Sequence, residues 1–154
     1  MISRLLHPGR NKAQSPETRL KPRCVLLAED DRSFRRYLEI FLKRSGYEVI
    51  SAVDGLEALN ILLAGRAVDV VMTDAIMPNL NGYQLSSMLK NNPRLSHLPI
   101  ILLSALEPQD SKYDIQHVDA FLVKPVSNDD LLNCLDNLIC LAHQKKSGVS
   151  ESGV

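Results

Sequence analysis

Polar side chains able to bind cations and phosphoryl groups stand at the ends of four of the five apolar segments in this 154-residue sequence. The acidic run 29–31 follows the first segment, and Asp74 follows the third. Ser104 follows the fourth segment, and Lys124 follows the fifth. Carboxylates brought together repel one another unless they are protonated, separated by solvent or neutralised by a cation. Mg²⁺ suits this task, because it prefers oxygen ligands and retains several waters.

Together, these residue types suit the transfer of a phosphoryl group onto a carboxylate. A metal ion beside a carboxylate keeps it charged and therefore able to act as a nucleophile. The ammonium group of Lys124 and the hydroxyl group of Ser104 can donate hydrogen bonds to the oxygens of an incoming phosphoryl group. The residues therefore predict Mg²⁺-dependent phosphorylation of an aspartate.

Each of these residues taken alone also has an ordinary structural explanation. An aspartate after a strand is a good N-cap for the next helix, which would explain Asp30 or Asp31. Ser104 would close a local turn, and Lys124 would be a solvated surface lysine. Asp74 is harder to explain in this way, because it directly follows an apolar strand and no helix begins immediately after it.

Apolar runs and helical periods alternate along the chain and position these residues. Strands are expected at residues 24–28, 47–51, 68–73, 98–103 and 120–123. The second strand alternates in polarity, which predicts an edge position. Amphipathic helices are expected between the strands and after the last one, with only one short helix in the segment 105–119. This order predicts an α/β fold with a parallel sheet covered on both faces, in which ligands bind at the carboxyl ends of the strands.

The net charge of zero hides an uneven distribution. Residues 1–23 carry six basic residues and one acidic residue, whereas residues 24–142 carry 10 basic and 16 acidic residues. We expect a disordered basic arm at residues 1–22, a single domain at residues 23–143 and a flexible tail at residues 144–154. No apolar run approaches the ~20 residues that would span a membrane. The three cysteines form no disulfide scaffold or zinc motif and fit a reducing, cytoplasmic compartment.

Four motifs of the sequence, in order along the chain, resemble those of receiver domains in two-component response regulators. They are Leu26-Leu27-Ala28-Glu29-Asp30-Asp31, Asp74-Ala75-Ile76-Met77-Pro78-Asn79-Leu80-Asn81-Gly82, Ser104-Ala105 and Lys124-Pro125. The resemblance covers residues 24–142, which is the whole expected domain. It implies a flavodoxin-like, doubly wound, five-stranded parallel sheet of strand order 2-1-3-4-5 in a three-layer αβα arrangement.

The resemblance also implies a role for each acid of the site. Asp74 would be the phosphoacceptor and a metal ligand. Asp30 would bind Mg²⁺ directly, and Glu29 would bind it through water. The backbone carbonyl of Ile76 would be a further metal ligand. Asp31 lies one residue beyond this acidic pair, so a helix cap is the better explanation for it.

Three further residues receive roles from the resemblance. Ser104 and Lys124 would bind oxygens of the phosphoryl group after transfer. Phe121 matches an aromatic position whose rotamer reports activation in the family, although packing on an edge strand explains it equally well. Ser104 and Phe121 would therefore form the switch between the two states.

The sequence departs from the family at several positions. Ile76 and Leu106 are apolar and stand two residues after Asp74 and Ser104, where neither can orient a hydrolytic water. We therefore expect slow hydrolysis of the aspartyl phosphate. The segment from Ser104 to Lys124 is somewhat short, and the usual Gly-Ala before the fifth strand reads Val118-Asp119-Ala120. The family's usual dimer is not carried over for this reason, and the oligomeric state stays open.

The leading hypothesis is a single-domain, chemotaxis-regulator-like response regulator that is phosphorylated on Asp74. The phosphoryl donor would be a histidine kinase or a histidine phosphotransfer protein, and the output would be a downstream protein target. Too few residues follow the last helix for a DNA-binding domain. The chain would not be an enzyme, although it would catalyse its own phosphorylation and dephosphorylation.

Two other classes of function remain as alternatives. A non-cycling interaction module with the same fold would not need the complete acidic set. An aspartyl phosphatase would call for a second acid two residues after the nucleophile, where this sequence has Ile76.

Overall fold

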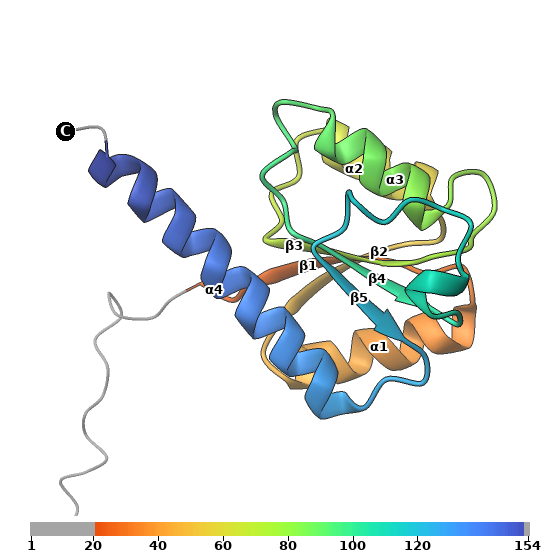
Figure 1. Cartoon of the computed structure of the whole chain (residues 1–154). Coiled ribbons are helices and arrows are strands. Elements are labelled where there is room, and N and C mark those ends of the chain that lie inside the picture. The colour runs from red at the N-terminus through yellow and green to blue at the C-terminus, as the bar shows by residue number, and fades with distance from the viewer. Residues whose placement is uncertain (1–20, 153–154) are drawn as a thin grey trace, which may run out of the picture.

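Five parallel strands, hydrogen-bonded in the order β2-β1-β3-β4-β5, form the central layer of the molecule (Figure 1). The structure is a computed structural model that describes residues 21–152. Its strands are β1 (Cys24–Ala28), β2 (Glu48–Ala52), β3 (Val70–Asp74), β4 (Ile100–Ser104) and β5 (Ala120–Val123). The expected fold class and strand order are confirmed. Strand β2 lies at an edge of the sheet, as its alternating polarity predicted.

Helices cover both faces of this sheet. They are α1 (Arg32–Arg44), α2 (Gly55–Leu63), α3 (Gly82–Lys90) and α4 (Asn128–Ser152). Helices α1 and α4 lie on one face, and α2 and α3 lie on the other (Figure 1). The result is the expected three-layer αβα arrangement. None of the helices within residues 21–152 combines the length and apolar character needed to cross a membrane.

The first residues of three helices are set by polar caps. The side chains of Asp31, Asp54 and Asn81 each accept a hydrogen bond from a backbone N–H in the first turn of α1, α2 and α3. Such a cap satisfies a donor that has no partner within the helix. The predicted capping role of Asp31 is confirmed. Because the caps lie just beyond the carboxyl ends of β1, β2 and β3, they hold the loops at that edge of the sheet.

Apolar side chains form a separate core on each face of the sheet. The cluster under α2 and α3 contains Leu26, Val71 and Leu85, and the cluster under α1 and α4 contains Leu27, Leu38 and Leu135. Strands β1 and β4 are buried along their whole length. The interior strands β1, β3 and β4 are therefore fixed by packing on both sides, and this rigidity extends to the residues at their ends.

The segment 105–119 differs from the expectation of a short α-helix. It contains only a three-residue 3₁₀ turn, Pro108–Asp110. Local side-chain bonds compete with helix formation here, since Ser111 Oγ accepts from the N–H of Tyr113 and Asp114 Oδ1 accepts from the N–H of Gln116. The segment is held by the ring of Tyr113, which stacks on that of Tyr83 in α3 with 4.5 Å between centroids.

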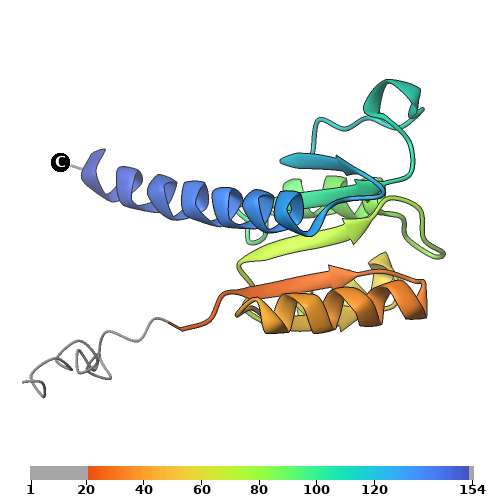
Figure 2. The same cartoon turned by 90° about the horizontal axis from the view of Figure 1, so that it is seen from below.

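Helix α4 is longer than expected and continues past the sheet (Figures 1 and 2). It reaches Ser152 and so includes most of the segment 144–154 that we expected to be a flexible tail. Gln144, Lys145 and Lys146 are good helix formers, and no proline interrupts them. The expected basic arm at residues 1–22 lies outside the described residues, apart from Lys21 and Pro22. The domain boundaries therefore stay predictions.

Candidate functional site

The carboxyl ends of four neighbouring strands bring the expected site residues to one edge of the sheet. Asp74 is the last residue of β3, and Ser104 is the last residue of β4. Glu29 and Asp30 follow β1, and Lys124 follows β5. Since all strands are parallel, their carboxyl ends meet at the same edge. The grouping of these residues, which was expected from their positions after the apolar segments, is what the structure shows.

Lys124 lies against two carboxylates at this edge. Its Nζ is 2.6 Å from Asp74 Oδ1 and 3.6 Å from Glu29 Oε2. Burial alone would lower the pKa of Lys124, but the hydrogen bond and charge of Asp74, together with Glu29, outweigh this effect and raise it. Lys124 is therefore held as an ammonium ion beside Asp74 and is not the solvated lysine of the ordinary explanation.

The carboxylates outnumber this one ammonium group. One ligand oxygen from each of Glu29, Asp30 and Asp74 can be chosen so that all lie within 4.8 Å of one another. Glu29 is 1% exposed, and its Oε2 accepts no hydrogen bond from the described part of the chain. Burial, with the charges of Asp74 and Asp30, raises the pKa of Glu29 to about 7. Burial also raises the pKa of Asp74, in spite of Lys124.

These three acids fit a divalent cation. Within residues 21–152 the buried Oε2 atom of Glu29 lacks a hydrogen-bond donor, and a metal ion or its bound water can satisfy such an atom. A cation would also offset the repulsion between the acids, which Lys124 offsets only in part. Ile76 lies two residues beyond Asp74 with its side chain 59% exposed. The role of its carbonyl as a ligand stays a prediction.

The loop from β3 to α3 is anchored by contacts that the sequence analysis did not assign to the site. Asn79 has a left-handed φ of 67° and donates from Nδ2 to Asp54 Oδ2 at 2.6 Å. A Cβ atom at Gly82 would lie 2.3 Å from the carbonyl oxygen of Asp74, so only glycine allows this close approach. Hydrogen bonds from the backbone N–H of Glu57 and from Asn79 lower the pKa of Asp54. These contacts fix the backbone of the loop that follows Asp74.

Arg35 supports the loop after β1 in a similar way. Its guanidinium group donates to the carbonyl of Glu29 at 2.7 Å and to the carbonyl of Asp30 at 3.4 Å. The backbone N–H of Asp31 donates to Glu29 Oε1 at 3.0 Å. Arg35 was not among the expected site residues, although its place in the first turns of the helix after the acidic run would have been a signal.

The two expected switch residues have ordinary contacts in this structure. Ser104 is buried, and its Oγ accepts from the N–H of Leu106 at 3.0 Å, which closes a turn. Phe121 is partly buried against Ala75, Tyr83 and Leu102. The structural explanations of both residues therefore hold, and their roles in switching stay predictions.

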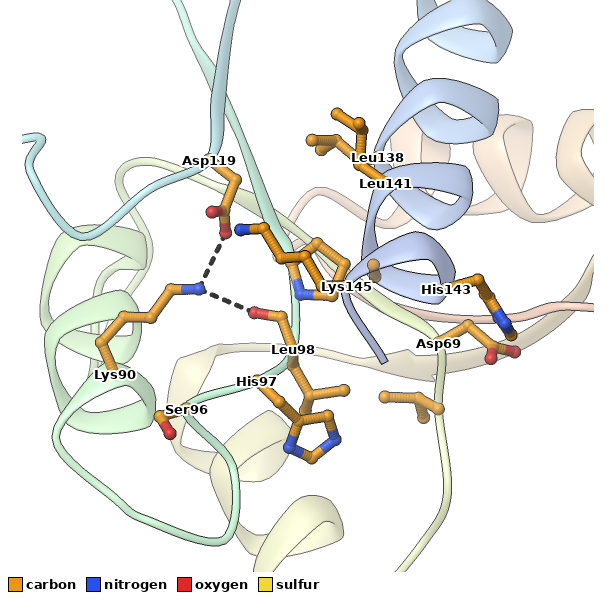
Figure 3. Close-up of a pocket in the computed structure, with 13 residues that line it drawn as sticks. Asp69, Lys90, Ser96, His97, Leu98, Asp119, Leu138, Leu141, His143 and Lys145 are labelled. Carbon is orange, nitrogen blue, oxygen red and sulfur yellow. Dashed lines mark hydrogen bonds and ion pairs between the residues drawn. The ribbon is translucent and has the colours of Figure 1, made fainter. Parts of the chain in front are cut away.

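A cavity of about 530 Å³ lies at the opposite edge of the sheet, near the amino ends of the strands (Figure 3). Its lining includes Asp69, Lys90 and Asp119. Asp119 Oδ2 accepts from Lys90 Nζ at 2.9 Å and from the N–H of Ile100 at 2.8 Å. Asp69 Oδ2 accepts from the N–H of Cys24 at 2.8 Å. Both aspartates of this cavity therefore stabilise the starts of neighbouring strands.

The family model of the response regulator receiver domain matches residues 25–136 of the chain. Protein PilG of Pseudomonas aeruginosa is 34% identical over 113 residues, which are 72% of this chain and 83% of PilG. The two-component response regulator-like protein PRR73 of Oryza sativa is 32% identical over 133 residues, which are 84% of this chain but 17% of that longer protein.

Solved structures agree with this assignment. The chemotaxis response regulator CheY4 of Vibrio cholerae has a TM-score of 0.69 at 28% identity, over 76% of this chain and 98% of CheY4. The response regulator TrrA of Thermotoga maritima, solved in complex with Mg²⁺-BeF, has a TM-score of 0.68 at 28% identity, over 75% of this chain and 98% of TrrA. The family match, the relatives and the strand order lead to the same conclusion: the chain belongs to the response regulator receiver domain family, whose members are signalling proteins.

Proposed function

We propose that this chain is a response regulator of a two-component phosphorelay, which accepts a phosphoryl group on Asp74. The donor is the phosphohistidine of a histidine kinase or of a histidine phosphotransfer protein in the cytoplasm. The output is a protein-binding surface that changes on phosphorylation. The observation that carries the proposal is the acidic cluster of Glu29, Asp30 and Asp74, in which Lys124 faces two carboxylates and the buried Glu29 Oε2 has no hydrogen-bond donor among residues 21–152.

Asp74 is the nucleophile of the proposed reaction. A carboxylate oxygen of Asp74 forms a bond to phosphorus while the bond from phosphorus to the donor imidazole nitrogen breaks, and its electron pair stays on that nitrogen. Mg²⁺, held by Glu29, Asp30, Asp74 and the Ile76 carbonyl, would supply positive charge to the phosphoryl oxygens. The strand end and the anchored β3–α3 loop hold Asp74 in place for this attack.

Lys124 and Ser104 act on the phosphoryl oxygens. The Lys124 ammonium group already donates to Asp74 and can transfer this hydrogen bond to a phosphoryl oxygen as the new bond forms. Ser104 Oγ accepts from Leu106 N–H, which leaves its own hydroxyl hydrogen free to donate. Binding of the phosphoryl group by Ser104 would shift the segment between β4 and β5. Phe121 packs on residues next to the site, so its side chain could change position in response.

The test is phosphorylation by a small donor. The protein is incubated with Mg²⁺ and acetyl phosphate, and its intact mass is measured; Asp74→Asn and a sample containing a chelator are the controls. We expect one added phosphoryl group on the natural chain, with acetate as the leaving group, and none in either control. Absence of labelling, or labelling that persists in Asp74→Asn, would contradict the proposal and favour the non-cycling interaction module.

A further inference from the structure

The ring of Phe34 contacts the ammonium group of the proposed site. Lys124 Nζ lies 4.8 Å from the centroid of this ring and 2.6 Å from Asp74 Oδ1. A cation within about 6 Å of an aromatic centroid is attracted by the negative face of the ring. In the sequence, Phe34 belongs only to the apolar stripe of a helix. In the structure it lies at the border of the core and is partly exposed, so its ring contacts both the apolar cluster and Lys124.

The ring of Phe34 is fixed from two directions. The backbone N–H of Phe34 donates to the capping residue Asp31 at 2.7 Å, which sets the first turn of α1. The ring then stacks on Tyr37, with 6.3 Å between centroids, and Tyr37 stacks on Phe41 with the same spacing. The hydroxyl group of Tyr37 donates to Asn128 Oδ1 at 2.8 Å, at the start of α4. Tyr37 therefore joins α1 to α4 and packs against the ring of Phe34 beside Lys124.

A ring and a carboxylate hold an ammonium group in different ways. The attraction of Lys124 to Glu29 and Asp74 depends on their negative charge, which a bound Mg²⁺ ion would largely offset. The attraction to the ring does not depend on that charge. A free lysine side chain also loses rotamer entropy when it is ordered. A fixed ring that restricts Lys124 beforehand lowers this cost at the moment when the phosphoryl group arrives.

We propose that Phe34 is a positioning residue for the phosphoryl transfer, because its ring keeps the Lys124 ammonium group over the site once the acids are neutralised. The inference rests on the proposed function of Asp74 and extends it to a residue outside the acidic motifs. It assigns the ring of Phe34 a role in the reaction besides its role in packing.

Three variants separate positioning from packing. Phe34→Leu keeps an apolar side chain and removes the aromatic face, whereas Phe34→Tyr keeps the face. Phe41→Leu removes a ring from the same row, at a position with no contact to Lys124, and serves as the matched control. Each variant is checked for cooperative thermal unfolding before it is used.

The first measurement needs neither metal nor phosphoryl donor. In the natural chain, the protons of the Lys124 methylene next to Nζ should have chemical shifts upfield of those of an ordinary lysine, because the end of this side chain lies over the ring. This displacement should be lost in Phe34→Leu and kept in Phe34→Tyr and Phe41→Leu. An unchanged shift in Phe34→Leu would overturn the contact on which the inference depends.

The second measurement is the rate of phosphorylation by acetyl phosphate at saturating Mg²⁺. Phe34→Leu should be slower by about fivefold, which corresponds to a cation–π attraction of ~1 kcal/mol. Phe34→Tyr and Phe41→Leu should each be phosphorylated at the rate of the natural chain. Equal rates for Phe34→Leu and the natural chain would overturn the inference but not the proposed function. Failure of the natural chain to be labelled would contradict the proposed function, while the chemical shifts would still report on the contact.

Discussion

The sheet carries acids and a lysine both where the amino ends of its strands meet (the amino edge) and where their carboxyl ends meet (the carboxyl edge). The hydrogen-bond partners of these acids differ between the two. At the amino edge, Asp119 Oδ2 accepts from Lys90 Nζ (Figure 3). Asp119 Oδ2 also accepts from a backbone N–H, and Asp69 Oδ2 accepts from another backbone N–H. At the carboxyl edge, three carboxylates lie together, Lys124 is the ammonium group between two of them, and Glu29 Oε2 has no hydrogen-bond donor in the described structure.

The amino edge repeats one structural arrangement. Asp69 stands before β3 and exchanges two hydrogen bonds with Cys24, the first residue of β1. Asp119 stands before β5 and does the same with Ile100, the first residue of β4. In each pair the backbone N–H of the aspartate donates to a carbonyl, and its carboxylate accepts from an N–H. Asp119 is thereby explained as a cap of the neighbouring strand.

Asp54 shows that the difference lies in the partners and not in the edge itself. It lies beyond the carboxyl end of β2 and is 8% exposed, yet hydrogen bonds from Glu57 N–H and Asn79 lower its pKa. Burial raises the pKa of Glu29 and Asp74 at the same edge. A buried carboxylate that accepts enough hydrogen bonds therefore has a structural role. A buried carboxylate that accepts too few is instead suited to bind a ligand.

The largest effect is expected for Mg²⁺ binding to Asp30→Asn. Removing a charged ligand should weaken the affinity by about a hundredfold or more, because even supporting partners of metal ligands are typically worth ~10–100-fold. Titration calorimetry measures this change. Asp69→Asn, which removes the same charge at the amino edge, should leave the affinity unchanged. Equal losses in the two variants would show that the protein's overall charge, and not a site, attracts the ion.

The second effect is a loss of stability in Asp119→Ala. The N–H of Ile100 and the Lys90 ammonium group both lose an acceptor, which should lower the free energy of unfolding by about 2 kcal/mol in urea. Lys90→Met removes the ion pair and the hydrogen bond from Nζ to the Leu98 carbonyl but keeps the bond from the Ile100 N–H, so it should cost less, about 1 kcal/mol. Phosphorylation by acetyl phosphate should be unchanged in both variants. Impaired phosphorylation in a folded Asp119→Ala protein would erase the distinction between the two edges.

The third effect is a pH-dependent contribution of Asp54. Its pKa is lowered from 3.8 on folding, so its charge stabilises the fold above this value and the contribution is lost as the pH falls below it. Asp54→Asn should therefore be less stable than the natural chain by about 1 kcal/mol near neutral pH. The gap should shrink at acid pH. Urea unfolding at both pH values measures it, and a gap that widens in acid would contradict a carboxylate held by donors.

The smallest effect concerns the lifetime of the phosphoryl group. Ile76 and Leu106 are more than half exposed beside the site and offer no polar atom to a hydrolytic water. Ile76→Asn and Leu106→Glu should each speed loss of the phosphoryl group by about fivefold, or ~1 kcal/mol of activation free energy. The mass of the phosphorylated protein is followed over time after the donor is removed. Unchanged lifetimes in both variants would refute the role of these apolar side chains.

Much of the carboxyl edge could be predicted from the sequence. Strands β1, β3, β4 and β5 are short apolar runs that end at or just before Glu29, Asp74, Ser104 and Lys124, so the parallel arrangement alone brings these side chains together. The cap at Asp31 follows from the same local pattern. These predictions succeeded because the signals lie within a few residues of the positions that they concern.

The remaining contacts depend on distances that no local pattern encodes. Phe34 contacts Lys124, although the two residues are far apart in the chain. Asp69 accepts from Cys24 only because β1 and β3 are neighbouring strands. The segment 105–119 had weak periodicity, and its Ser111 and Asp114 bonds favour turns over the expected helix. The length of α4 was underestimated, because the sequence after Ala142 carries no apolar stripe that would indicate a helix.

The most direct test compares the two edges in one sample. Mn²⁺, a paramagnetic ion with similar ligand preferences to Mg²⁺, is added to the isotope-labelled protein, and the broadening of backbone amide signals is recorded by NMR. Signals of residues 29–31 and 74–76 should broaden first, those of Asp69 and Asp119 should stay sharp, and Asp30→Asn should suppress the broadening. Equal broadening at both edges, or none at the carboxyl edge, would contradict the assignment of the metal site to Glu29, Asp30 and Asp74.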